Sequence, residues 1–376
     1  MLPGTIVIPV VRSFVTSAWP DAEWLMHAFI AVNLLGAVVG GPLLAVRAER
    51  MGRRRLVAGV CAVLDGALLL SVTLAPPVWL LLGLRFVQGA VYIAAVSILM
   101  GTIRRQSKSP AAMGVVGSAV VLSILIGIPL GAILAKTSPT LPLLVGGVIG
   151  VLTGFVALVV LPKSTDAEQS QVTFRSLIFD APRLRAPTIV VALERFAVGA
   201  LIVPLQLYGH HVLAVPDSQV NGWFSAFLMI FALGTWPMAR LGDRLDRWKL
   251  IALGALVYSA SYVVLPFVPT PSIVVVLSFA GLASAAIYGP SLGLASQAVP
   301  DTARASAMAV LNAAGTLGMF LGSTLAGGVS SAMLSAGVER GAAYTTVFVA
   351  AGIVQLLSVG VALTEPSRNS SDAATR

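Results

Sequence analysis

Long apolar runs separated by short polar segments repeat along almost the whole chain. The runs are continuous rather than alternating, and a helix needs roughly 20 apolar residues to cross a hydrocarbon core about 30 Å thick. Because lipid offers no partner for an unpaired backbone group, such runs indicate membrane-spanning helices rather than strands. We predict eleven full spans, at residues 23–46, 56–75, 77–102, 111–135, 141–162, 188–209, 218–241, 249–268, 272–297, 305–333 and 342–363.

A shorter apolar segment, residues 1–11, stands before these spans. As a helix it would cover only about 17 Å, at about 1.5 Å per residue. We interpret it as the outer half of a first helix whose inner half lies upstream of Met1, followed by an outward segment that holds Arg12. The sequence then predicts an all-α polytopic membrane protein with twelve intended helices, the first truncated at its N-terminus.

The charges agree with this topology. They make up only 10% of the chain, against about 25% in typical soluble domains, which excludes the soluble classes. If successive polar segments face opposite sides, 19 of the 24 Lys and Arg residues lie on one side. This bias predicts a protein of the inner (plasma) membrane with both termini in the cytoplasm. It also accounts for the net charge of +9, so nucleic acid is not expected as a partner.

Little in the polar segments suggests reaction chemistry. The single cysteine, Cys61, and the three histidines give no basis for a metal site, and no cofactor is expected. We also find no paired catalytic carboxylates, no nucleophile beside a base and no phosphate-binding glycine loop. An enzyme is therefore not expected, and the lipid bilayer is the partner that the composition implies.

Two polar loops repeat a pattern of one acidic residue among arginines, at residues 45–54 and 239–249. Each loop follows the second span of a six-span block. Two six-helix halves joined by one long loop form the parallel-repeat plan of a large transporter class. The pairs are Glu49 with Asp243, Arg50 with Arg244 and Arg53 with Arg247, all at an offset of 194 residues.

The repeat sets the expected domain boundaries. The N-terminal half is residues 1–162, with its first helix partial, and the C-terminal half is residues 188–364. The polar segment 163–187 is the expected cytoplasmic linker, and residues 365–376 form a cytoplasmic tail.

The first loop carries a family resemblance. The run Glu49-Arg50-x-Gly52-Arg53-Arg54 resembles the loop signature G-x-x-x-D-R-x-G-R-R of the major facilitator superfamily, with Ala45 in place of the leading glycine. The resemblance covers essentially the whole chain and implies a transporter that works by alternating access. The second copy departs from the pattern, because Asp246 stands where glycine is expected.

Two further motifs resemble particular branches of that superfamily. In the span 77–102, Leu81-x-x-x-Arg85-x-x-Gln88-Gly89 resembles the pattern of proton-coupled members. In the span 111–135, Gly127-Ile-Pro129-Leu-Gly131 resembles the pattern of drug/proton antiporters and arabinose-efflux-permease-like proteins. The Gly-Trp-Arg that usually follows is absent, so packing alone is the alternative explanation.

Intramembrane charges are the candidate coupling residues, because a charge in a bilayer is costly. Arg85 shares a helix face with Gln88 and Tyr92, and the resemblance implies that this helix lines a central cavity. A structural ion pair with a neighbouring helix is the alternative for Arg85. Asp65 lies at a similar depth, and an Asp65–Arg85 pair is one hypothesis.

Glu194 and Arg195 form the second candidate pair, within the span 188–209. A membrane carboxylate that alternately binds a proton and a substrate is a simple device for antiport. The alternative is that Glu194 pairs with a basic residue and stays charged throughout. Weaker candidates for substrate contact are Gln206, Tyr208 and Tyr288.

The two repeated loops are expected to latch the halves together on the cytoplasmic side in one state of the transport cycle. The alternative is that their arginines serve only as topology signals. The expected latch residues are Glu49, Arg50, Gly52, Arg53, Asp243, Arg244 and Arg247.

Together these observations predict proton-coupled efflux of a small organic compound, such as a drug, a sugar-like molecule or a natural product. The substrate and protons are the expected ligands, and a monomer is the expected form. A nutrient/proton symporter is the first alternative. A non-transporting membrane sensor or a degraded relative is the second.

Overall fold

The computed structural model describes residues 2–7, 10–19, 24–106, 112–162, 175, 177 and 181–365. Regular structure in these residues is helical. The helices are α1 (Leu2–Thr5), α2 (Val11–Ala18), α3 (Trp24–Arg50), α4 (Arg54–Val72), α5 (Val78–Gln106), α6 (Ala112–Ala135), α7 (Leu141–Val160), α9 (Pro182–His211), α10 (Asp217–Arg244), α11 (Arg247–Val264), α12 (Ile273–Gln297), α13 (Arg304–Ser335) and α14 (Arg340–Thr364). Short 3₁₀ turns occupy Leu265–Phe267, Thr270–Ser272 and Asp301–Ala303.

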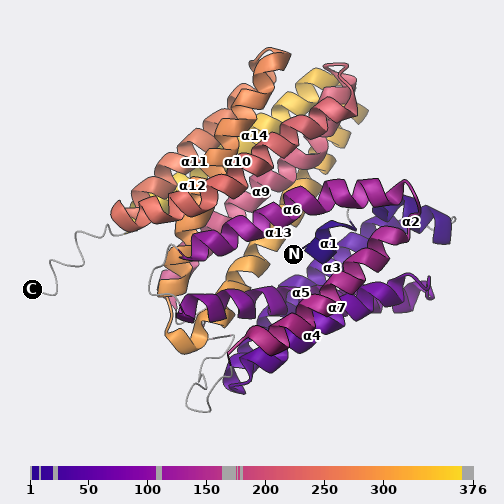
Figure 1. The fold of residues 1–376 in the computed structure, drawn as a ribbon. Coiled ribbons are helices and arrows are strands. Elements are labelled where there is room, and N and C mark those ends of the chain that lie inside the picture. Colours follow the sequence, from indigo (N-terminus) through magenta and orange to yellow (C-terminus); the bar gives the residue numbers. More distant parts are fainter. Residues whose placement is uncertain are drawn as a thin grey trace, which may run out of the picture. The chain divides into compact units, whose positions relative to one another are not determined.

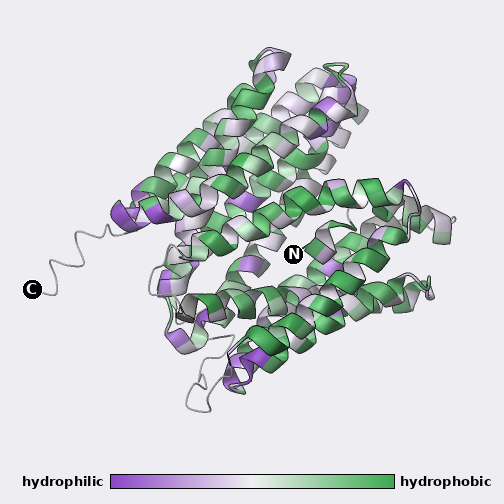
Figure 2. Cartoon of the chain, viewed as in Figure 1, coloured by the Kyte–Doolittle hydropathy of each residue, from purple (hydrophilic) through white to green (hydrophobic). Residues whose placement is uncertain are grey.

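Eleven helices within the described residues are long and apolar enough to cross a membrane. This finding confirms the predicted number of full spans. Hydrophobic residues dominate the middle of the helices, whereas hydrophilic residues gather at helix ends and loops (Figure 2).

The chain divides into two compact units. The first gathers Met1–Lys108, Leu122–Ala181 and Ala298–Ala313, and within it α3, α4, α5 and α7 lie side by side (Figure 1). The second gathers Ser109–Val121, Pro182–Gln297 and Ala314–Arg376, with contacts that link α9, α10, α11, α12 and α14. Two helices, α6 and α13, begin in one unit and end in the other.

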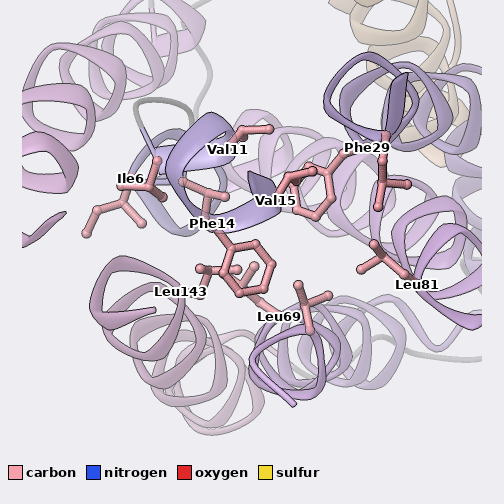
Figure 3. Packing of buried hydrophobic residues seen from close by; sticks show 12 residues of the cluster. Ile6, Val11, Phe14, Val15, Phe29, Leu69, Leu81 and Leu143 are labelled. Atoms are coloured by element: carbon pink, nitrogen blue, oxygen red, sulfur yellow. The ribbon is translucent and has the colours of Figure 1, made fainter. Parts of the chain in front are cut away.

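Helix α2 lies in the segment that we expected to be an outward connection. Its apolar residues Val11, Phe14 and Val15 follow the i, i+3, i+4 spacing of one helix face, and all three are buried. They pack with residues of α3, α4, α5 and α7 in one hydrophobic cluster (Figure 3). The ring of Phe14 meets that of Phe29 at 6.5 Å. Burial of this face explains a helix that the length of the apolar run does not reveal.

Glycines set the closest helix contacts. Gly36 on α3 lies against the backbone of Phe86 on α5, and Gly89 on α5 lies against the backbone of Asn33 on α3. In the second unit, Gly318 and Gly322 of α13 lie against backbone carbonyls of α9. Small residues let membrane helices approach this closely. The α9–α13 contact also fixes the part of α9 that carries Glu194 and Arg195.

The α9–α13 contact predicts how substitutions of the α13 glycines change the stability of the protein. In Gly318→Ala, the new methyl group would lie 2.9 Å from the carbonyl carbon of Ala192. Overpacking of this kind lowers the free energy of unfolding by about 1–3 kcal/mol. We expect a lower melting temperature in detergent micelles, followed by tryptophan fluorescence.

Gly327→Ala is the matched control on the same helix, because nothing lies within 4 Å of a Cβ at that position. Alanine favours a helix over glycine by about 1 kcal/mol, so this variant should melt at the same temperature or higher. Equal losses in the two variants would contradict the packing described here.

Candidate functional site

The carboxylate of Glu49 caps the beginning of α13. Glu49 is 1% exposed, near the end of α3. Its Oε1 accepts a hydrogen bond from the backbone N–H of Ala305 at 2.8 Å, and its Oε2 accepts one from the N–H of Ser306 at 3.1 Å. The Ser306 hydroxyl also donates to Oε2. The first N–H groups of a helix lack partners within that helix, and a negative charge there is favourable. Glu49 therefore provides acceptors that α13 itself lacks.

Arg54 completes this contact from the first turn of α4. Its Nε lies 3.9 Å from Glu49 Oε1, and its Nη2 donates to the carbonyl of Thr302 at 3.0 Å. Small residues surround the polar contact and let the helices approach. The surrounding cluster is Ala45, Ala48, Ala58, Ile98, Ala305 and Ala309.

The other residues of this loop lie differently. Gly52 has φ 63°, in the left-handed region that favours glycine, and it ends α3 with its N–H bonded to the carbonyl of Glu49 at 3.2 Å. Arg50 and Arg53 are exposed. The buried arginine of the loop is Arg54, which our list of latch residues omitted.

The second loop pairs its charges locally. Arg247 Nη2 lies 2.6 Å from Asp243 Oδ1, and its Nη1 donates to Gln297 at the end of α12. Asp246 caps α11, where its side chain accepts from the N–H groups of Trp248 and Lys249. This cap explains why aspartate stands at the position of the expected glycine. Arg244 is exposed.

Arg85 joins α5 to α3. Its Nε donates to the backbone carbonyl of Phe29 at 3.2 Å, and its Nη1 donates to Gln88 Oε1. The guanidinium carbon lies 4.1 Å from the centre of the Phe29 ring. In return, the side-chain amide of Asn33 donates to the carbonyl of Arg85 at 3.0 Å. Arg85 thus has acceptors for two of its nitrogens and an aromatic face.

Asp65 on α4 reaches this cluster through Gln88. The Asp65 carboxylate interacts with the Gln88 side chain and with the charge of Arg85. Its Oδ1 is buried and accepts no hydrogen bond. Asp65 and Arg85 are both among the described residues, and their charged atoms do not come within 4.0 Å of each other. The direct pair that we considered is therefore replaced by contacts of each residue with Gln88. Tyr92 turns its ring toward α1, with Cε2 3.7 Å from a Cβ built on Gly4.

Glu194 is fully buried on α9. The hydroxyl of Ser284 on α12 donates to its Oε1. Its Oε2 accepts no hydrogen bond and lies 3.4 Å from Arg195 Nε. One oxygen of this membrane carboxylate is therefore available to a proton.

Arg195 lies between aromatic rings of α10 and α12. Its guanidinium carbon is 4.4 Å from the centre of the Tyr288 ring and 5.1 Å from that of Phe231. Its charge also interacts with the Tyr288 hydroxyl. Gly315 of α13 lies beside its stem, because a Cβ there would be 3.2 Å from Arg195 Cγ.

The remaining candidate residues have packing partners. Tyr208 is buried, donates its hydroxyl to the carbonyl of Pro266 at 3.2 Å and meets the Phe348 ring edge-on. The amide of Gln206 donates to Asn221 Oδ1 at 2.7 Å.

The motif of α6 packs against α1. Gly127 lies against Thr5, whose hydroxyl donates to the carbonyl of Ser123 at 3.1 Å. Gly131 is buried and Pro129 is exposed within the helix. In the first unit, this motif thus provides a close helix contact.

The sequence analysis did not identify four residues that form contacts with the candidate charges, namely Arg54, Phe231, Ser284 and Ser306. Arg54 had a signal, because it ends the loop motif. The other three are common residue types in apolar helices, and their partners lie 36 to 257 positions away along the chain. Only the fold brings them together.

The family model described as Major Facilitator Superfamily matches residues 4–210 and, in a second match, residues 188–376. A search of curated proteins finds no match.

Two solved structures have the same fold over nearly their full lengths. The human organic anion transporter MFSD10 (TETRAN) has a TM-score of 0.75 at 16% identity, covering 96% of this chain and 95% of that one. The proton:xylose symporter XylE, bound to 6-bromo-6-deoxy-D-glucose, has a TM-score of 0.72 at 17% identity, covering 97% and 94%. At such identities these likenesses show the fold alone. Because the family matches extend from residue 4 to residue 376, the chain belongs to the major facilitator superfamily of membrane transporters.

Proposed function

We propose that this transporter couples the movement of a small organic compound to protons by alternating access. The observation that carries the proposal is Glu194, a carboxylate buried in a membrane-spanning helix with one oxygen that accepts no hydrogen bond. The bilayer disfavours a charged carboxylate, so proton uptake at this group has a physical reason. The chemistry is binding and release, and no covalent bond is broken.

Export by antiport is the form that the sequence motifs favour. Gly127, Pro129 and Gly131 resemble the antiporter pattern, and Arg85 with Gln88 resembles the pattern of proton-coupled members. The candidate substrates are a drug, a sugar-like compound or a natural product. Arg85, Gln88, Tyr92 and Asp65 are the proposed coupling group of the first unit.

Symport is the second candidate, and a specific observation favours it. Arg195 beside Glu194 offers a positive charge whose counter-ion is also a proton acceptor. The solved relatives are described as an organic anion transporter and a proton:xylose symporter, so neither printed name indicates proton-driven drug export. A non-transporting sensor remains the alternative from another class.

The contact at the start of α13 supports a latch. Glu49 and Arg54 hold this helix start through hydrogen bonds that must break if α13 moves away from α3 and α4. We propose that this contact closes the cytoplasmic side in one state. We also propose that residues 1–162 and 188–364 form the two halves of the transporter. It would be a monomer in the inner membrane, with both termini in the cytoplasm.

Proton movement tests the function. We would load everted membrane vesicles with an acid interior and add ethidium, xylose or benzoate to the outside. Antiport predicts that the interior pH rises when the transported compound is added. Symport predicts that the interior pH rises only when the compound is loaded inside. Glu194→Gln should abolish either response, because it removes the proton acceptor.

Glu339→Gln is the matched control, since it makes the same change at the exposed N-cap of α14. Normal proton movement in Glu194→Gln would remove Glu194 from the mechanism. Silence of the wild type in both arrangements, across a broad panel, would favour the non-transporting alternative.

Thiol labelling tests the latch. Ser97 on α5 is fully buried and accepts a hydrogen bond from Asn312 of α13 at 3.1 Å. In a Cys61→Ser background, Ser97→Cys places one thiol behind α13. Hydrogen bonds to a charged group contribute about 1.5–3 kcal/mol, so Glu49→Gln should speed N-ethylmaleimide labelling about tenfold.

The control is Asp301→Asn, which removes a carboxylate at the same helix start. Asp301 pairs with Arg304 at 2.5 Å and is 64% exposed, so its loss should change the labelling rate little. A labelling rate that is the same with and without Glu49 would contradict the latch.

A further inference from the structure

The two arginines inside membrane spans differ in the hydrogen-bond and ion-pair partners that the described residues provide. Arg85 donates to a backbone carbonyl and to an amide oxygen. The partners of Arg195 are one carboxylate, one phenol hydroxyl and two ring faces. A guanidinium carries several N–H donors, and buried donors without acceptors are costly. Among the described residues, Arg195 is therefore the intramembrane arginine with fewer hydrogen-bond acceptors, and its side chain is 11% exposed.

The surroundings of Arg195 fix its direction. The rings of Tyr288 and Phe231 flank the guanidinium, and they meet each other edge-on at 5.8 Å. Gly315 lets α13 lie directly against the side-chain stem. A cation held this way needs no ordering when an anion arrives, which reduces the entropic cost of binding. Both rings are themselves buried, with 3% of Tyr288 and 1% of Phe231 exposed.

The ion pair with Glu194 is an incomplete one. The two residues are neighbours on one helix and point about 100° apart. Their single contact of 3.4 Å is not the bidentate arrangement in which arginine binds carboxylates most strongly. A ligand carboxylate in the plane of the guanidinium can supply that arrangement.

We propose that Arg195 binds the negative group of a small organic monoanion, with Glu194 as the counter-ion that the ligand replaces. This inference rests on the proposed proton-coupled transport and names the substrate class of the same site. It excludes cations, which Arg195 repels. It also disfavours polyanions, since no second arginine contacts Glu194 or Arg195 among the described residues.

Charge balance then links the anion to a proton. Glu194 and Arg195 together are neutral, so a bound monoanion leaves one negative charge in a low-dielectric site unless Glu194 takes up a proton. The other titratable groups that interact with Glu194 are Tyr258 and Tyr262 of α11 and Tyr288 of α12. These are phenols, which are neutral near pH 7. Proton and anion thus bind together at this site, as symport requires.

Binding to the full chain in lipid nanodiscs tests the proposal. We would measure radiolabelled benzoate and compete it with 1-naphthoate, the neutral benzamide and the cation benzylamine. Naphthoate should displace benzoate, whereas the amide and the amine should be at least about tenfold weaker. Benzoate should bind more tightly at about pH 5.5 than at about pH 7.5, because proton and anion binding are reciprocally linked.

Variants assign the effect to Arg195. Arg195→Gln should weaken benzoate binding at least about tenfold, with little change in melting temperature. Arg340→Gln, the same change at the exposed start of α14, should bind normally. Glu194→Gln should bind benzoate at least as tightly as the wild type at about pH 7.5 and lose the pH dependence.

Three results would overturn the proposal. They are competition by benzamide equal to that by naphthoate, unchanged binding in Arg195→Gln, and no binding of either anion to the wild type. If protons move with ethidium or xylose while benzoate does not bind, proton-coupled transport stands and the anion site is wrong. If benzoate binds as expected but no compound moves protons, the anion site is supported and the coupling fails.

Discussion

The bilayer offers no water to a charge, and this constraint decides where the polar side chains of the chain lie. Among the described residues, the buried charged groups are Glu49, Arg54, Asp65, Arg85 and Glu194, with Arg195 almost as enclosed. Each one has partners from another helix or from its neighbour in the chain. The apolar helices set the environment, and these few polar contacts specify how the helices pair.

The buried charged groups differ in how many of their polar atoms have a hydrogen-bond partner. Arg85 has a carbonyl, an amide and a ring as partners, and its contacts with Phe29 link α5 to α3. Glu194 and Arg195 share one ion pair of 3.4 Å, and Oε2 of Glu194 accepts no hydrogen bond. A site that exchanges ligands needs such incompleteness, because groups fully occupied by the protein have nothing to offer a substrate. Glu49 belongs to the complete contacts, since both of its oxygens accept hydrogen bonds from the start of α13.

Patterns along the chain were sufficient for the architecture. Apolar runs longer than a bilayer is thick predicted all eleven full spans, because helix length and composition are local properties. Helix α2 was not predicted, because a helix of eight residues with three apolar residues on one face is hard to distinguish from the longer apolar runs around it. The loop motif predicted Glu49 as a contact residue. It did not identify Arg54 as its partner, because four arginines in one loop are alike until the fold buries one of them.

The functional residues were harder to rank from sequence. Arg85 was the leading candidate on its motif, and the structure gives it two hydrogen-bond acceptors, whereas the less prominent Arg195 has an ion pair with its neighbour Glu194. That difference depends on Phe29, Tyr288 and Phe231, whose contacts with the arginines join separate helices. Spacing along one helix carries no information about such contacts. The proposed division of the intramembrane charges into structural and ligand-binding groups therefore rests on contacts that only the fold shows.

This division is the central claim, and the melting temperatures of Arg85→Gln and Arg195→Gln test it most directly. Arg85→Gln would leave the buried carbonyl of Phe29 and the side-chain oxygen of Gln88 without this donor, at a cost of about 1–3 kcal/mol each, so it should melt below the wild type. Arg195→Gln should melt close to the wild type, because few protein acceptors lose a donor and Glu194 accepts a proton when its partner is gone. A large loss of stability in Arg195→Gln, or none in Arg85→Gln, would contradict the account.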